Sequence, residues 1–244
     1  MPGRKPELRA EPLVVRDLSL CFTSFELNRV SLTVEPGEVA ALLGHNGAGK
    51  TTTLRLIMGM VRKDGGSVRV GGLDHTRDER AFKIRVGFVP EEGFFYGKMR
   101  VKELLAFVAD FYPGWDAELC ARLAKSLNVP LDKRLGELSK GTRTKVSLLA
   151  AVSHHPDVLL LDEPTSGLDP RSRAEVLRLM KDLASAEGRG VLFSTHNLHE
   201  VEQIADRVVV VQNGSVIAHE RLQDLRRNAG GAWSLETFYL EVTP

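Results

Sequence analysis

The chain has 244 residues, of which 43% are hydrophobic and 27% charged, and its formal net charge is +1. This length is sufficient for a buried core, and the near-neutral charge excludes a bulk electrostatic attraction to nucleic acid or anionic lipid. The two widely separated cysteines indicate neither a disulfide framework nor a zinc site. There is no run of 18 apolar residues and no apolar segment after the basic N-terminus, so neither a membrane-spanning helix nor a signal peptide is predicted.

The first predicted elements lead into a glycine-rich loop. Residues 12–43 read as short strands with a turn at 35–38, and the last strand, EVAALL, is apolar. GHNGAGKT follows at 44–51, and the residues after it have helical spacing. A strand, a glycine-rich loop and a helix form the context in which this pattern binds phosphate. The alternative, a glycine-rich turn without function, is disfavoured by this context.

The residue types of the loop explain the chemistry. Gly44, Gly47 and Gly49 let the backbone curl so that its N–H groups form an anion-binding nest at a helix N-terminus. Lys50 reaches the β- and γ-phosphates, and the Thr51 hydroxyl is placed to ligate Mg²⁺. The sequence therefore predicts that the loop binds a nucleoside triphosphate. The other loop residues assigned to this site are His45, Asn46, Ala48 and Thr52.

Further along the chain, helical and strand patterns alternate in blocks. Strands are predicted at 67–72 and 86–90, on either side of a charged helix at 78–84. From residue 91 to about 155 the pattern is helical, at 101–112, at 116–129 and after Ser139. From 157 onward strands and helices alternate again, and the last segments are strands at 206–214 and 215–219 and a helix at 220–227.

One of these later strands ends in two adjacent acids. In DVLLLDEP (157–164), residues 158–161 read as a strand that is buried on both faces. The acids Asp162 and Glu163 follow at its carboxyl end, where open α/β sheets bind ligands. Asp162 is the candidate Mg²⁺ ligand, and Glu163 is free to act as the general base on the attacking water. A helix-capping or merely solvated pair of acids is the alternative.

Five more motifs follow GHNGAGKT in the chain, namely VPEEG (89–93), LSKGT (138–142), VLLLDEP (158–164), SGLD (166–169) and STH (194–196). In this order the six motifs resemble one family, the ATP-binding cassette (ABC) ATPases. The resemblance implies an α/β fold, the P-loop NTPase of the ABC type, with a mixed sheet core, an antiparallel β subdomain and a helical subdomain. It implies a single domain over 12–244, in which 91–155 form the helical subdomain and 12–90 and 156–244 form the rest. The match looks closest to the ABC-2-type exporter branch.

The resemblance also assigns roles at LSKGT and SGLD. It implies that Ser139 and the backbone of Gly141 contact the γ-phosphate of ATP held by a second subunit, and that Asp169 organises the contact between subunits. Without the resemblance, Ser139 and Asp169 are each a helix N-cap. Lys140 and Thr142 depart from the family's L-S-G-G-Q, which leaves the ribose side of this half-site open.

Three more residues are assigned by resemblance. Glu91 occupies the place of a family glutamine that ligates Mg²⁺, and a carboxylate suits this hard cation equally well. A solvated acid at Glu91, or the neighbouring Glu92 in its place, is the alternative. His196 would contact the γ-phosphate and orient the water. Phe22 falls where the family stacks an aromatic ring on adenine, and Phe25 competes for that role.

The sequence therefore predicts an ATP- and Mg²⁺-dependent ATPase subunit of an ABC transporter, peripheral on the cytoplasmic face of the cell membrane. Its expected partners are an integral membrane permease, in an exporter, and a second ATPase subunit, in a homodimer or a heterodimer, but no nucleic acid. The alternatives are a soluble ABC ATPase that acts on DNA or ribosomes and a P-loop regulatory switch. One cassette, a short helical insertion and two cysteines disfavour the first, and LSKGT disfavours the second.

Overall fold

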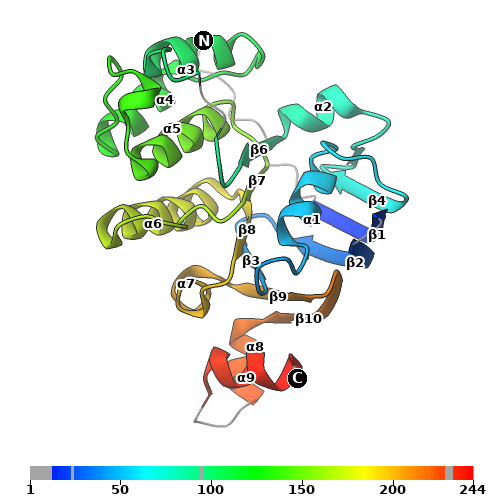
Figure 1. Ribbon diagram of the computed structural model, residues 1–244. Helices are drawn as coiled ribbons and strands as arrows, with labels where there is room; N and C mark the ends of the chain where they lie inside the picture. Colours follow the sequence, from blue (N-terminus) through cyan, green and yellow to red (C-terminus); the bar gives the residue numbers. More distant parts are fainter. Residues whose placement is uncertain (1–12, 23–24, 94–95, 229–232, 244) are drawn as a thin grey trace.

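The computed structural model describes residues 13–22, 25–93, 96–228 and 233–243. Two sheets form its framework, one of six strands and one of four strands. Figure 1 shows the six-stranded sheet in the middle, the four-stranded sheet to one side and a group of helices above. The predicted α/β fold with a mixed sheet and an antiparallel sheet is confirmed.

The six-stranded sheet has the strand order β10-β9-β3-β8-β7-β6. β3, β6, β7, β8 and β9 are parallel to one another, and β10 is antiparallel to β9. The parallel strands therefore deliver their carboxyl ends to one edge, where a ligand site is expected. The bounds are β3 Val39–Leu43, β6 Val86–Val89, β7 Val158–Leu161, β8 Gly190–Thr195, β9 Arg207–Gln212 and β10 Ser215–Arg221.

Strands β3 and β7 are apolar throughout because both faces of this sheet are covered. In β3, Val39, Ala41 and Leu43 belong to one apolar core, and Ala40 and Leu42 belong to the other. β7 divides in the same way, so all four of its residues are buried, as predicted. Buried strands of this kind fix the loops that leave their ends.

The four-stranded sheet is antiparallel, in the order β2-β1-β4-β5. It shares the second core with α1, which follows the glycine-rich loop, and β2 also contacts β10 of the larger sheet. This sheet thus packs on the side of the molecule that carries the glycine-rich loop. The bounds are β1 Leu13–Phe22, β2 Phe25–Val34, β4 Gly65–Val70, β5 Leu73–Asp74, α1 Lys50–Ile57 and α2 Glu79–Ile84.

Of the remaining helices, α5, α6 and α7 contact the central sheet, and α3 and α4 pack against α5. The segment predicted to be helical carries α3, α4, a 3₁₀ turn (η1) and α5, of which α5 packs against β6 and α6. Figure 1 shows these three helices as one group, with α8 and α9 at the opposite end. The bounds are α3 Val101–Ala109, α4 Ala117–Ser126, η1 Leu135–Glu137, α5 Lys140–Val152, α6 Pro170–Glu187, α7 Leu198–Ile204, α8 Leu222–Asn228 and α9 Leu235–Val242.

One predicted boundary is wrong. The helix expected at 220–227 begins only at Leu222, because β10 continues to Arg221. Glu220 and Arg221 pair across the ladder with Val208 and Arg207 of β9. Hydrogen bonding to a neighbouring strand therefore overrides the local helical pattern at these two positions.

Candidate functional site

The glycine-rich loop joins β3 to α1 in the conformation that its sequence requires. Gly47 has φ 84° and Gly49 has φ 111°, values that favour glycine. At Gly44, a Cβ would lie 2.4 Å from the carbonyl oxygen of Val211, so only glycine fits there. Among the described residues, the backbone N–H groups of Gly47, Gly49 and Lys50 have no acceptor, and α1 begins without a side-chain cap. These free donors fit a bound phosphate.

Lys50 lies buried at the start of α1. Its Nζ donates to the carbonyl oxygens of Gly44 at 2.8 Å and His45 at 3.2 Å. The same Nζ lies 3.2 Å from the Glu163 Oε1, in an ion pair whose side chains are 6% and 9% exposed. The ammonium is therefore held at the mouth of the loop, where phosphate oxygens would compete for it.

The two acids after β7 point to different partners. The Asp162 Oδ1 accepts from Thr51 Oγ1 at 3.0 Å and from Ser194 Oγ at 2.7 Å, and the residue is 2% exposed. Ser194 Oγ also accepts from the backbone N–H of Glu163 at 2.8 Å. Glu163 itself has φ 44°, a strained value for a residue with a Cβ. The turn at Glu163 directs its carboxylate away from Asp162, toward Lys50 and His196.

His196 follows β8 and faces Glu163. Its Nδ1 lies 3.1 Å from Glu163 Oε2 and 3.3 Å from Oε1, and its side chain is 54% exposed. Strands β7 and β8 are adjacent in the sheet, so their carboxyl ends bring the two residues together. Glu163 is thus in contact with a lysine on one side and a histidine on the other.

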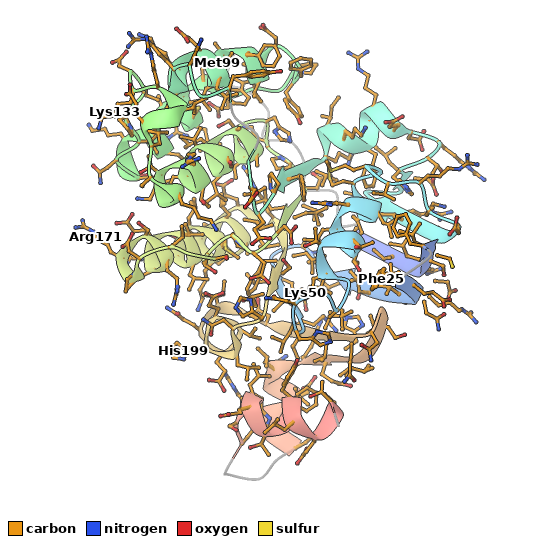
Figure 2. The ribbon with its side chains drawn as sticks, in the orientation of Figure 1. Phe25, Lys50, Met99, Lys133, Arg171 and His199 are labelled. Carbon is orange, nitrogen blue, oxygen red and sulfur yellow. The ribbon has the colours of Figure 1, made fainter. Side chains whose placement is uncertain are left out.

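These residues surround one cleft of about 470 Å³. Figure 2 labels Lys50 and Phe25, both of which line it. Phe22 pairs with Phe25 across β1 and β2 but does not line the cleft, and its ring is exposed. Of the predicted site residues, Asn46, Gly47, Gly49, Lys50, Thr51, Thr52, Glu91, Glu163 and His196 line the cleft.

The predicted loop residues Gly44, His45 and Ala48 do not line the cleft. Gly44 and Ala48 are buried beneath it, and His45 is exposed, with its Nδ1 2.7 Å from the carbonyl oxygen of Asn46. Asp162 does not line the cleft either, but it accepts a hydrogen bond from Thr51, which does.

Ser139, Gly141 and Asp169 also lie outside the cleft, at the starts of α5 and α6. The Ser139 hydroxyl accepts from the N–H of Thr142, and the Asp169 carboxylate accepts from those of Arg171 and Ser172. Both N-cap interpretations are therefore observed. Hydrogen bonds from the Ser172 side chain and backbone hold the pKa of Asp169 below its ordinary value. A Cβ at Gly141 would lie 3.0 Å from Ser172 Oγ, so the two helix starts approach closely.

Glu91 borders two clefts. Besides the nucleotide cleft, it lines a second one of about 360 Å³, together with Glu92 and with Lys140 and Arg143 of α5. Glu92 lines only the second cleft. Of the two adjacent acids that the sequence offers as Mg²⁺ ligands, Glu91 is therefore the one that lines the nucleotide cleft.

Three residues that shape the site were assigned no role from the sequence. The Ser194 hydroxyl bridges Asp162 and Glu163. Ser166 lines the cleft, and the N–H of Ser166 donates to the carbonyl oxygen of Glu163. Thr195 is buried beside His196. Ser166, Ser194 and Thr195 all lie inside recognised motifs, so their motif membership was the available signal.

The molecule resembles known proteins over most of its length. The sequence profile of the family described as "ABC transporter" matches residues 27–166. A second profile, described as "AAA domain, putative AbiEii toxin, Type IV TA system", matches residues 131–202.

Two relatives and one solved structure illustrate the similarity. ABC transporter ATP-binding protein NatA of Bacillus subtilis (strain 168) is 38% identical over 203 residues, which cover 80% of this chain and 82% of NatA. Nod factor export ATP-binding protein I of Burkholderia lata is 36% identical over 198 residues, 79% of this chain and 64% of that protein. A structure described as the ATP-binding subunit of an ABC transporter has a TM-score of 0.86 and 32% identity, and the match covers 96% of this chain and 100% of that one.

The family match agrees with the chemistry of the cleft. A glycine-rich loop with free N–H donors, a buried lysine and a carboxylate beside a histidine suit the binding and hydrolysis of a nucleoside triphosphate. The chain therefore belongs to the ATP-binding subunits of the ABC transporter family, which are ATPases.

Proposed function

We propose that this chain is the subunit that binds and hydrolyses MgATP to drive a separate membrane permease, in an exporter. The observation that carries the proposal is the position of Glu163 in the cleft, 3.2 Å from Lys50 Nζ and 3.1 Å from His196 Nδ1. This arrangement places a candidate base between the group that binds phosphate and the group that would orient water.

ATP enters the cleft with its phosphates at the start of α1. The loop N–H groups and Lys50 hold the β- and γ-phosphates. Phe25 lines the cleft, which supports it as the ring that stacks on adenine, in preference to Phe22. A Cβ at Gly49 would lie 2.9 Å from the Phe25 ring, so the ring lies directly against the loop.

The oxygen donors present fit a magnesium ion. Thr51 Oγ1 and Asp162 Oδ1 are 3.0 Å apart, and Glu91 lines the same cleft. The described residues contain no group of three His, Cys, Asp or Glu side chains around one point. Because Mg²⁺ is usually bound by one or two carboxylates plus substrate phosphates, Thr51, Asp162 and Glu91 would complete a site that ATP itself provides. A bound ion would neutralise charge on the phosphates.

Hydrolysis is assigned to Glu163 and His196. Glu163 takes a proton from the attacking water. His196 holds the water and the γ-phosphate from the other side. When phosphate oxygens take Lys50, its ion pair with Glu163 is exchanged for a phosphate contact, so ATP binding frees the carboxylate for its role as a base.

The predicted site residues that lie outside the cleft are assigned a contact with a second subunit. Ser139, Gly141 and Asp169 start α5 and α6, and in one copy they do not line the nucleotide cleft. We assign them to ATP held by a second ATPase subunit. The division into a helical subdomain at 91–155 and a core at 12–90 and 156–244 belongs to the same proposal.

We assign the contact with the permease to an apolar groove of about 510 Å³ between α2 and the end of α3. Lys83, Val108 and Tyr112 line it with Phe111, which is 61% exposed, and Phe107 beside it is 52% exposed. Exposed aromatic groups beside an apolar groove suit a protein partner. Within the described ranges, no helix is long and apolar enough to cross a membrane. The name of the Nod factor relative supports export, and the cytoplasmic membrane face follows from the same assignment.

Glu163→Gln and Lys50→Ala test the proposal as a pair. Glu163→Gln keeps the size of the side chain and should lower the ATPase rate by about 10²- to 10⁴-fold while MgATP still binds. Lys50→Ala should abolish tight MgATP binding, because it removes the positive charge that contacts the β- and γ-phosphates. The assays are steady-state phosphate release and the titration of a fluorescent ATP analogue. A Glu163→Gln rate equal to wild type would transfer the base role to His196, and unchanged ATP affinity in folded Lys50→Ala would overturn the loop assignment.

A further inference from the structure

Glu200 of α7 is a buried carboxylate to which the proposed mechanism gives no role. The residue is 3% exposed. Its Oε2 accepts from the Thr195 hydroxyl at 2.9 Å, and its Oε1 lies 3.5 Å from Asn197 Nδ2 and 3.6 Å from Arg173 Nε. A buried charge is tolerated only where hydrogen bonds and an opposite charge compensate it, so these contacts define where Glu200 can act.

Two of these partners flank His196 in the sequence. The Thr195 hydroxyl also accepts from the backbone N–H of Asn197, at 3.0 Å. A hydroxyl has one hydrogen, and donating it to Glu200 turns a lone pair toward Asn197. Glu200 thereby fixes the backbone on both sides of His196. The His196 side chain is 54% exposed, so its neighbours in the chain, more than packing, set its direction.

The third partner connects this arrangement to α6. Arg173 lies in the first turn of α6, and its backbone N–H donates to the carbonyl oxygen of Asp169 at 3.0 Å. Within the described part of the chain, its Nε has no hydrogen-bond partner, so Arg173 interacts with Glu200 through charge. The carboxylate of Glu200 therefore joins the loop of His196 to the helix start that carries Asp169.

We infer that Glu200 is a positioning residue for ATP hydrolysis. Through Thr195 and Asn197 it holds His196 against Glu163, and through Arg173 it ties that orientation to the start of α6. The inference rests on the proposed function, in which Glu163 and His196 act on ATP. It predicts that the contacts of Glu200 affect the rate of the chemical step more than they affect nucleotide binding.

Glu200→Gln and Thr195→Val test this inference through the split between kcat and KM. Glu200→Gln removes the charge that faces Arg173 and weakens the acceptor for Thr195, and Thr195→Val removes the hydroxyl at nearly constant volume. Each should lower kcat at least about tenfold, because small losses of catalytic geometry are costly. KM for MgATP should stay within about twofold, since the phosphate loop is untouched. Thr195→Ser restores the hydroxyl and should recover most of the lost rate.

Glu202→Gln is the matched control. It is the same substitution on the same helix, but the Glu202 Oε1 accepts from the backbone N–H of Leu235, away from His196. It should keep the wild-type kcat. Thermal melts of all variants show whether they are folded, and if Glu200→Gln fails to fold, Thr195→Val decides the question.

The double variant His196→Ala/Glu200→Gln separates positioning from an independent effect. If Glu200 acts through His196, the double variant should be no more than about twofold slower than His196→Ala alone. Rate losses that multiply would overturn the inference, as would wild-type kcat in both Glu200→Gln and Thr195→Val. A wild-type rate in His196→Ala would instead overturn the role proposed for His196, and this inference with it.

Discussion

At the residue scale, Glu163 is held in a strained and compensated position. Its φ of 44° costs on the order of 1–3 kcal/mol for a residue with a Cβ. Its N–H donates to Ser194 Oγ and its carbonyl oxygen accepts from the Ser166 N–H, and these two hydrogen bonds keep it there. Lys50 and His196 compensate its buried carboxylate. Glu163→Gln keeps the size of the side chain, and it leaves Lys50 its hydrogen bonds to the carbonyl oxygens of Gly44 and His45, so the loss of the ion pair is partly compensated.

Glu91 is the second residue whose environment is informative. It borders both the nucleotide cleft and the cleft that contains Lys140 and Arg143. A carboxylate in this position can be attracted to a cation in the first cleft or to the basic residues in the second. The glutamine of the family would carry no such charge.

Variants of Glu91 should change the magnesium requirement. Glu91→Gln keeps an oxygen ligand and should retain substantial ATPase activity, whereas Glu91→Ala should raise the Mg²⁺ concentration needed for half-maximal rate. The measurement is the ATPase rate against Mg²⁺ concentration at constant ATP. Glu92→Ala is the control, because Glu92 lines only the second cleft. If Glu91→Ala matches wild type and Glu92→Ala does not, the ligand is Glu92.

At the element scale, three helices begin at residues of functional interest. α5 and α6 start with side-chain caps at Ser139 and Asp169. α1 starts at Gly49 with no side-chain cap and no acid in its first turn. The free N–H groups of α1 are therefore available to an anionic ligand, whereas those of α5 and α6 are partly used within the chain.

The turn after α5 carries a buried histidine that contacts the segment after α3. The His154 ring stacks on Tyr112 with a centroid distance of 3.9 Å, and His154 is 4% exposed. Burial lowers its pKa to about 4. Burial also raises the pKa of Tyr112. Both groups are thus held in their neutral forms at the contact between the segments that follow α3 and α5.

The stability of the protein should decrease between about pH 6.5 and about pH 4. In this window the unfolded chain binds a proton at His154 and the folded chain does not, so the free energy of unfolding falls as the pH decreases. The difference corresponds to at most about 3 kcal/mol. His154→Phe keeps the aromatic stack and should reduce the slope. Urea unfolding at pH 7 and pH 4.5 measures the effect.

His199→Phe is the control for this measurement, because His199 is exposed on α7. Some slope should remain in His154→Phe, since burial also lowers the pKa values of His75 and His219. A His154→Phe variant with the full wild-type slope would show that other groups account for the pH dependence.

At the scale of the whole molecule, the parts assigned to ATP lie on separate surfaces. The cleft is bordered by α1 and by the ends of β6, β7 and β8, whereas Ser139 and Gly141 start α5 outside it. One copy therefore cannot bring both to the same nucleotide in this arrangement. Two copies that face each other would enclose two ATP molecules between the glycine-rich loop of one and α5 of the other.

Glu163→Gln should accumulate as an ATP-bound dimer. Lys50, Thr51 and Asp162 still hold the phosphates and the ion, and the loss of a negative charge beside the γ-phosphate stabilises the closed pair. Gel filtration with light scattering, with and without MgATP, measures the mass. Asp162→Asn should bind MgATP weakly and stay monomeric. A Glu163→Gln variant saturated with ATP that stays monomeric would exclude a homodimer and favour a heterodimer.

The sequence by itself determined the sheet core, the phosphate loop and the family. Runs such as residues 158–161 are apolar throughout, and only a strand covered on both faces explains them. The loop residues were also predictable, because the glycines, the lysine and the threonine all lie within residues 44–51. In both cases the physical constraint is local, so the order of residues expresses it directly.

Only the tertiary structure decided how distant residues meet. The order of strands β3, β8 and β7 places His196 against Glu163, and it is Phe25, not Phe22, that lines the cleft. It also showed that β10 extends two residues into a helical pattern and that Glu200 supports the loop of His196. These features depend on contacts between segments far apart in the sequence, and such contacts leave no periodic signal in the sequence around each residue.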